Sequence, residues 1–228
     1  MIPQGSVIGP LLANLFLHYA FDRWMDKHHP LVPFERYADD CLVHCKTEAE
    51  AIRLMNAIDQ RLAECKLELH PDKSKIVYCQ DGQRKQAYPC VQFDFLGYSF
   101  QPRQAKSHWG NLFLNFSPAI SPKAERSIRK TIRSWKIHRW TQLSIEALAA
   151  SFNPVIRGWI NYYGKFYRSK LSSILGQLDY ALARWAKRKY KRLRGSQTRA
   201  REWLRRLARN QPRLFEHWRL TLQPTAGR

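Results

Sequence analysis

Residues 34–44 read FERYADDCLVH, in which two adjacent acids, Asp39 and Asp40, stand between two short apolar runs. The runs at 34–38 and 41–44 favour strands and predict a hairpin with the acids at its tip. Adjacent carboxylates repel each other, and a hard cation such as Mg²⁺ relieves that repulsion. An isolated acidic pair is more often an ordinary turn, so the surrounding sequence has to decide between a turn and a metal site.

Outward from this hairpin, the spacing of apolar residues predicts a mixed α+β fold. Two expectations concern local irregularities. In 91–100 the strand alternation changes phase, which predicts a bulge near Gly97. A helix over 143–163 is expected to break at Asn153-Pro154, because the residue before proline avoids the helical region. The predicted helices lie at 8–27, 48–65, 122–137, 143–163 and 171–193, and the predicted strand segments at 34–44, 66–78, 91–100 and 112–116. The segment 66–78 is expected to contain a turn around Pro71-Asp72 as well as a strand.

The charge is distributed very unevenly along the 228 residues. Residues 1–100 hold 11 basic and 13 acidic side chains, whereas 101–228 hold 28 and 5, a net charge of +23. Such an excess is typical of a protein that binds a polyanion. RNA, DNA and an anionic membrane surface all remain candidate partners. The simpler alternative is a generically basic, well-solvated surface. Eight Trp and ten Tyr favour nucleic acid, because aromatic rings stack on unpaired bases.

The overall composition excludes several other classes of protein. With 44% hydrophobic residues the chain can fill a core, so wholesale disorder is not expected. No uninterrupted apolar stretch approaches the ~18 residues of a membrane-spanning helix, and no signal peptide is expected. The five cysteines are odd in number and contain no Cys-x-x-Cys pair. These cysteines predict a reduced, cytoplasmic protein without a zinc ribbon.

An ordered set of motifs surrounds the acidic pair, and a further motif follows in the basic half. They are PQGS at 3–6 with LLAN at 11–14, YADD at 37–40, PDKSKI at 71–76, FDFLGY at 93–98 and NPVIRGWINYY at 153–163. The first four resemble the palm of reverse transcriptases, in particular those of the group II intron reverse transcriptase/maturase family. The last resembles the maturase-specific segment, which forms the thumb and binds intron RNA in that family.

The resemblance implies roles for residues of the first half. Asp39 and Asp40 would hold Mg²⁺ for nucleotidyl transfer, and Lys73 would contact the triphosphate or protonate the pyrophosphate leaving group. Lys75 is nearly as well placed, and a solvated turn lysine is the plain alternative for Lys73. Two further sets are implied: Gln4 and Gly5 against the incoming dNTP and template, and Phe95, Leu96 and Gly97 as the grip on the primer.

In the basic half, the resemblance implies contacts to intron RNA from side chains that combine charge with aromatic rings. Helix packing explains the aromatic residues equally well, so the arginines and lysines are the stronger candidates. The implied RNA-binding residues are Arg129, Arg133, Arg157, Tyr162, Tyr163, Lys165 and Arg168.

The resemblance also implies a region that precedes the PQGS motif in the family and carries the fingers and another metal-binding Asp. Asp39 and Asp40 alone leave one side of a two-metal site open. We therefore expect Mg-dependent synthesis on an RNA/DNA primer–template only when an N-terminal reverse transcriptase fragment is supplied. An RNA-binding maturase module and a truncated remnant without polymerase activity are the alternatives. The expected domains are a partial palm at 1–116, a helical thumb and maturase domain at 117–193, and a basic helical extension with a tail at 194–228.

Overall fold

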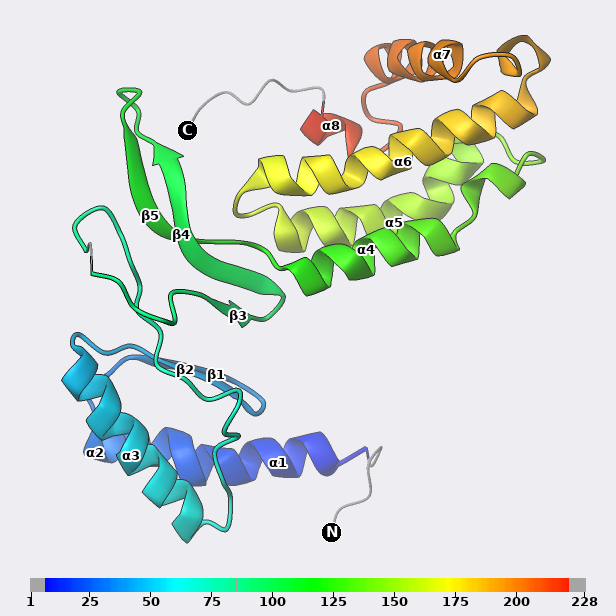
Figure 1. Ribbon diagram of the computed structural model, residues 1–228. Helices are drawn as coiled ribbons and strands as arrows, with labels where there is room; N and C mark the ends of the chain where they lie inside the picture. The colour runs from blue at the N-terminus through cyan, green and yellow to red at the C-terminus, as the bar shows by residue number, and fades with distance from the viewer. Residues whose placement is uncertain (1–6, 85, 222–228) are drawn as a thin grey trace. The chain divides into compact units, whose positions relative to one another are not determined.

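A computed structural model describes residues 7–84 and 86–221 (Figure 1). The chain forms two compact units. The first takes in Met1–Tyr78 with Tyr88–Cys90, and the second takes in Cys79–Ala87 with Val91–Arg228. Each unit has a hydrophobic core of its own. Helices and antiparallel sheets share the described chain, which confirms the predicted α+β class.

The helices of the first unit follow the prediction closely. The helix expected at 8–27 is present as α1 (Gly9–Leu17), a π-helical segment η1 (His18–Asp22) and α2 (Arg23–His28). The second predicted helix is α3 (Glu48–Glu64), which begins where the Thr47 hydroxyl accepts a hydrogen bond from the backbone N–H of Glu50. The core of the unit joins these helices through Phe21, Met25, Leu54, Ile58 and Leu62.

The predicted acidic hairpin is also present. Strand β1 (Phe34–Tyr37) pairs with β2 (Asp40–Val43) in an antiparallel two-stranded sheet, in which Tyr37 lies opposite Asp40. The loop between them is therefore just Ala38 and Asp39. Ala38 has a left-handed φ of 55°, a conformation that a residue with a Cβ adopts reluctantly. The tightness of this turn brings the two acids to the end of the hairpin.

The strand predicted within 66–78 is wrong. This segment, all of it described, forms the expected turn at 71–73 but contains no strand. A strand needs a neighbour that supplies its ladder of hydrogen bonds. One such bond joins the N–H of Tyr78 to the carbonyl of Cys90 at 2.9 Å, and it lies at the end of the segment. The preference of these residues for β structure was not sufficient to form a strand, because no described strand pairs with this segment.

The sheet of the second unit explains the change of phase near Gly97. Strands β3 (Phe93–Phe95), β4 (Tyr98–Lys106) and β5 (Leu112–Ile120) follow one another in an antiparallel sheet. Phe95 pairs with Tyr98 across a two-residue turn, and the φ angles of Leu96 and Gly97 are 48° and 78°. Two left-handed residues are the mark of a type I′ hairpin turn. The predicted bulge is thus wrong, and the irregularity is a chain reversal.

After β5 the second unit is mainly helical, as expected. Helix α6 contacts α4, α5 and α7, and its buried face forms the centre of the core (Figure 1). Three helix starts are capped by Ser121, Ser144 and Ser196, because each side-chain oxygen accepts a hydrogen bond from the backbone N–H three residues further on. The elements are α4 (Pro122–Ser134), η2 (Ile137–Arg139), α5 (Ile145–Tyr163), α6 (Arg168–Lys189), η3 (Lys191–Leu193), α7 (Gln197–Asn210) and α8 (Trp218–Thr221).

The predicted break at Asn153-Pro154 is absent, because α5 runs through Pro154. Buried residues on both sides of the proline, Phe152 and Ile156, hold the helix against the core. The Asn153 amide nitrogen donates to the carbonyl of Leu214 at 2.8 Å, and its amide oxygen accepts from the N–H of Glu216 at 3.1 Å. Tertiary packing outweighs the local preference that predicted a break.

Two other observations bear on the sequence predictions. The predicted limit between the palm and the thumb, at 116 and 117, falls inside β5. None of the described helices combines the length and the apolar character that crossing a membrane requires.

Candidate functional site

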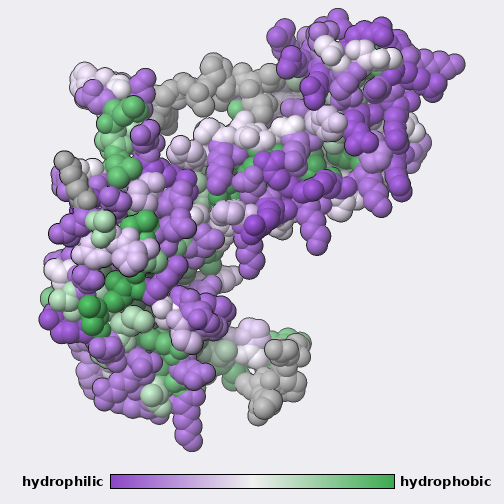
Figure 2. Space-filling model, in the orientation of Figure 1, coloured by the Kyte–Doolittle hydropathy of each residue, from purple (hydrophilic) through white to green (hydrophobic). Residues whose placement is uncertain are grey.

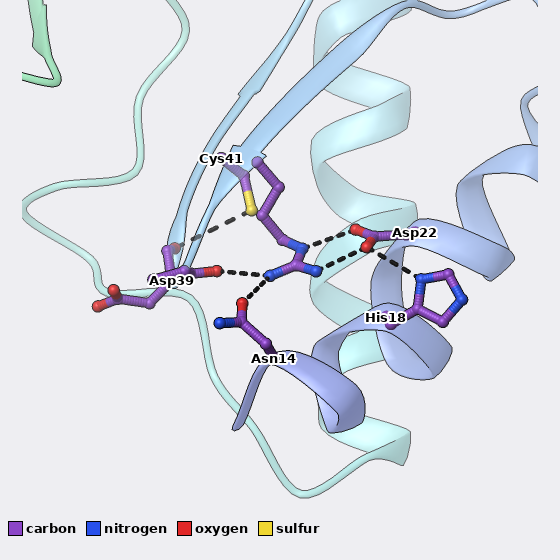
Figure 3. A network of polar contacts seen from close by, with 7 residues as sticks. Asn14, His18, Asp22, Asp39 and Cys41 are labelled. Atoms are coloured by element: carbon purple, nitrogen blue, oxygen red, sulfur yellow. Dashed lines mark hydrogen bonds and ion pairs between the residues drawn. The ribbon is translucent and has the colours of Figure 1, made fainter. Parts of the chain in front are cut away.

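The two acids of the hairpin turn are exposed and face solvent. Within residues 7–84 and 86–221, no hydrogen bond or ion pair engages the carboxylate of Asp39 or that of Asp40. Figure 3 shows the Asp39 carboxylate pointing away from Asp22 and Asn14. Two carboxylates that share a tight turn and have no partner cation among the described residues have oxygen atoms free to accept a positive ion.

The cation next to this turn, Arg36, is bound elsewhere (Figure 3). Its Nε and Nη2 donate to the two carboxylate oxygens of Asp22 at 2.7 and 2.6 Å. Its Nη1 donates to the side-chain oxygen of Asn14 and to the carbonyl of Ala38, both at 2.9 Å. The hydrogen bond from Arg36 lowers the pKa of Asp22 and outweighs the opposing effect of burial. Arg36 thus ties the turn to α1 and η1 and neutralises Asp22 rather than the turn acids.

The donor set of the turn fits Mg²⁺ rather than a softer metal. Carboxylate oxygens are hard ligands, and Mg²⁺ is commonly held by one or two carboxylates together with substrate phosphates. Desolvation raises the pKa of the neighbouring Cys41 thiol to about 11. Its soft sulfur is not a ligand that Mg²⁺ prefers. Among the described residues no cluster of three or more His, Cys, Asp or Glu side chains is suited to hold a metal.

The structure gives less support to the other site residues predicted in the first half of the chain. Lys73 ends an exposed turn that follows α3, and its N–H donates to the carbonyl of His70 at 3.2 Å. Lys75 is exposed as well, so exposure does not separate the two lysines. Gln4 and Gly5 lie outside the described residues.

The predicted primer grip lies in the second unit and is in contact with the end of α5. Phe95 ends β3, and Leu96 and Gly97 form the following turn. The hydroxyl of Tyr162 donates to the carbonyl of Leu96 at 2.8 Å. The structure therefore brings one residue predicted to bind RNA together with the predicted grip, an association that sequence spacing did not indicate.

The predicted RNA-binding arginines of the helices are partly engaged within the protein. Arg129 is paired with Glu125 at 2.8 Å and Arg157 with Glu216 at 2.7 Å. Arg133 donates to the carbonyl of Arg129, and Arg168 donates to that of Gly164. Such pairing reduces the charge that Arg129 and Arg157 offer to a polyanion.

Other cations of the second unit are more exposed, and apart from Arg133 they were not among the residues predicted to bind RNA. Helix α4 buries Ala124, Ile128 and Ile132 and turns its basic residues outward, and α7 repeats this arrangement. Figure 2 shows hydrophilic residues over much of the visible face of these helices. The signal that identifies them is the basic spacing of three or four residues opposite an apolar stripe. The exposed cations are Lys123, Arg126, Lys130 and Arg133 on α4, and Arg199, Arg201, Arg205, Arg206 and Arg209 on α7.

A shallow cavity brings two of the predicted residues together. It lies at the junction of α5 and α6 and has a volume of about 220 Å³. Lys165 and Arg168 line it with Asn161 and Gly164 and with the apolar Ile160 and Leu220. Two cations beside an amide suit an anionic group such as a backbone phosphate.

Comparison with known families agrees with this geometry. Residues 1–100, which include the acidic turn and the β3–β4 turn, match the reverse transcriptase (RNA-dependent DNA polymerase) family. This match places the first part of the chain in the RNA-directed DNA polymerase family. Residues 125–207 match the group II intron maturase-specific domain. The chain belongs to the group II intron reverse transcriptase/maturase family, which implies nucleic acid as its partner. A search of curated proteins gave no match.

Proposed function

We propose that this chain carries part of the catalytic palm of an RNA-directed DNA polymerase and that Asp39 and Asp40 hold Mg²⁺ for nucleotidyl transfer. The observation that supports this is the pair of exposed carboxylates on the β1–β2 turn, which no described residue neutralises while Arg36 is engaged with Asp22. The cost of holding two like charges at adjacent positions is recovered when a divalent cation binds.

Each residue then has a distinct task. When bound, Mg²⁺ would activate the primer hydroxyl and neutralise charge on the reacting phosphate. Asp39 and Asp40 hold the ion, and Lys73 contacts the triphosphate or gives a proton to the leaving pyrophosphate. By the family resemblance, Gln4 and Gly5 would contact the dNTP and template, and the segment Phe95, Leu96 and Gly97 would grip the primer.

Two carboxylates do not complete a two-metal site. We propose that the further ligand comes from an N-terminal reverse transcriptase segment, supplied in the same polypeptide or by another chain. Asp22 is unsuited to this task because both of its oxygens accept hydrogen bonds from Arg36. Synthesis on an RNA/DNA primer–template accordingly depends on that segment.

The metal site can be tested on the chain itself with Mn²⁺, a paramagnetic substitute for Mg²⁺. Substoichiometric Mn²⁺ should broaden the amide NMR signals of residues 38–41 more than others in the protein. Asp39→Asn should remove most of this local broadening, because it removes one of two charged ligands. Excess Mg²⁺ should restore the sharp signals by competition.

The matched control is Asp26→Asn, which removes an exposed acid from α2. It should leave the broadening at 38–41 as in the wild type. Broadening that is equal around Asp26 and the turn would mean that Mn²⁺ associates with acids in general, and the metal site would be rejected.

A second function is favoured by the outward cations of α4 and α7. We propose that residues 117–193, with the extension 194–228, bind intron RNA for splicing and mobility, while 1–116 act as the palm. The net charge of +23 over 101–228 supports a long RNA contact. A chain that binds RNA without polymerising is then the alternative to a polymerase. We also propose a cytoplasmic location, because the odd number of cysteines and the lack of a Cys-x-x-Cys pair favour a reduced protein.

A further inference from the structure

The β3–β4 turn has a backbone that its own sequence does not favour. Type I′ turns prefer Asn or Gly at the first central position, where φ is positive. Here that position holds Leu96, with a φ of 48°. A bulky residue in the left-handed region persists when surrounding contacts fix it. The source of those contacts is therefore of interest.

The contacts come from the end of α5 and the start of α4. The Tyr162 hydroxyl donates to the carbonyl of Leu96 at 2.8 Å, and the N–H of Ser121 donates to the carbonyl of Gly97 at 2.9 Å. In the reverse direction, the Tyr98 hydroxyl donates to the carbonyl of Tyr162. The turn and the helix end thus exchange hydrogen bonds, and both turn carbonyls are fixed from outside the hairpin.

Tyr163 restricts the turn in a second way. A Cβ on Gly97 would lie 2.9 Å from the Tyr163 hydroxyl oxygen, closer than ordinary contact allows. The ring of Tyr163 also packs on Tyr98, with centroids 5.5 Å apart. Gly97 is therefore required both by its φ of 78° and by the close approach of α5.

We propose that Tyr162 and Tyr163 are positioning residues, which hold the Leu96–Gly97 turn in place so that the maturase-specific helix α5 sets the geometry of the primer grip. Both tyrosines lie in the region that matches the maturase-specific domain, and the turn lies in the region that matches the reverse transcriptase. The two matched regions are coupled here by direct contact. This inference rests on the proposed role of the turn in holding the primer.

The contact itself is tested by hydrogen–deuterium exchange on the full chain. Tyr162→Phe keeps the ring and removes the hydrogen bond to Leu96, so amides in a 93–100 peptide should exchange faster while α4 and α6 stay protected. The matched control is Tyr180→Phe, on a tyrosine of α6 with similar exposure, 48% against 47%. Unchanged exchange in 93–100 would overturn the inference.

A double-mutant cycle tests the role of Tyr163. Gly97→Ala should lower the melting temperature by more than Gly110→Ala, because Gly110 has a similar φ of 86° and lacks such a close contact. Adding Tyr163→Phe should recover part of the loss at Gly97 and none at Gly110. Equal losses at the two glycines, with no recovery, would show that Tyr163 does not restrain the turn.

The functional consequence is measured by single-turnover primer extension with an N-terminal reverse transcriptase segment supplied. Tyr162→Phe should slow extension about two- to tenfold, as expected for one lost hydrogen bond, and should lower the extension rate by a larger factor than it weakens primer–template affinity. Faster exchange with an unaltered extension rate would overturn the positioning role. A wild-type protein that fails to extend would count against the proposed polymerase function, while exchange and melting still report on the contact.

Discussion

Arg36 and Asp22 form the best-defined polar contact beside the acidic turn. They are 14 residues apart in sequence, and both carboxylate oxygens of Asp22 accept hydrogen bonds from the guanidinium. A charged, two-point contact of this kind fixes orientation as well as distance. It sets the turn against the helix that precedes it and leaves the charges of Asp39 and Asp40 for another cation.

This contact predicts a pH-dependent loss of stability for Asp22→Asn. At neutral pH the variant should lose about 1–3 kcal/mol of unfolding free energy, because a charge-assisted pair is broken. The hydrogen bond from Arg36 lowers the pKa of Asp22 below its ordinary value of 3.8. The Arg36–Asp22 pair therefore stabilises the folded protein fully at pH values above that ordinary pKa. This stabilisation disappears as the pH falls through the lower pKa of Asp22 in the folded protein.

Thermal or urea unfolding at pH 7, 5 and 3 measures the effect. The difference in unfolding free energy between wild type and Asp22→Asn should be constant from pH 7 to 5 and should be smaller at pH 3. Asp26→Asn, which alters an exposed acid of α2, should stay close to the wild type throughout. A gap that is the same at all three values would mean that the charge of Asp22 is not involved.

At the scale of elements, local periodicity predicted the helices because burial repeats with the helical period on one face. The core positions Ile128 and Ile132 of α4 are an example. The acidic turn was predictable for a similar local reason. The errors arose where distant residues decide: the turn at Gly97 is held by Tyr162, and the helix continues through Pro154 under the packing of Phe152 and Ile156.

The outward face of α4 carries a prediction about RNA. Replacing Arg126, Lys130 and Arg133 together by Gln should weaken binding of the full chain to structured intron RNA at low salt. It should also reduce the slope of log affinity against log salt by about two to three, because each lost phosphate contact removes about one unit. Filter binding or fluorescence anisotropy at several salt concentrations measures both effects.

The control removes the same number of exposed cations from the first unit, at Lys27, Lys46 and Arg53. This triple variant should keep most of the affinity and nearly the whole slope. Equal losses in the two variants would mean that the protein attracts RNA through its overall charge, and a specific role for α4 would be rejected.

At the scale of the whole molecule, the chain divides its chemistry between two parts of different charge. Residues 1–100 are close to neutral and hold the acidic turn, while 101–228 carry a net charge of +23. The order of the motifs was enough to indicate the family, and both family matches agree with it. The division into two units was not predictable, because it depends on which segments pack together. In particular, Cys79–Ala87 belongs to the second unit and Tyr88–Cys90 to the first.

Metal-dependent primer extension by this chain together with an N-terminal reverse transcriptase segment is the most direct test of the central claim, that the acidic turn is the catalytic metal site. Wild type and the control Asp26→Asn should extend a DNA primer on an RNA template in Mg²⁺, and Asp39→Asn should lose about a hundredfold or more of the rate. Extension by Asp39→Asn at the rate of the wild type would contradict the claim.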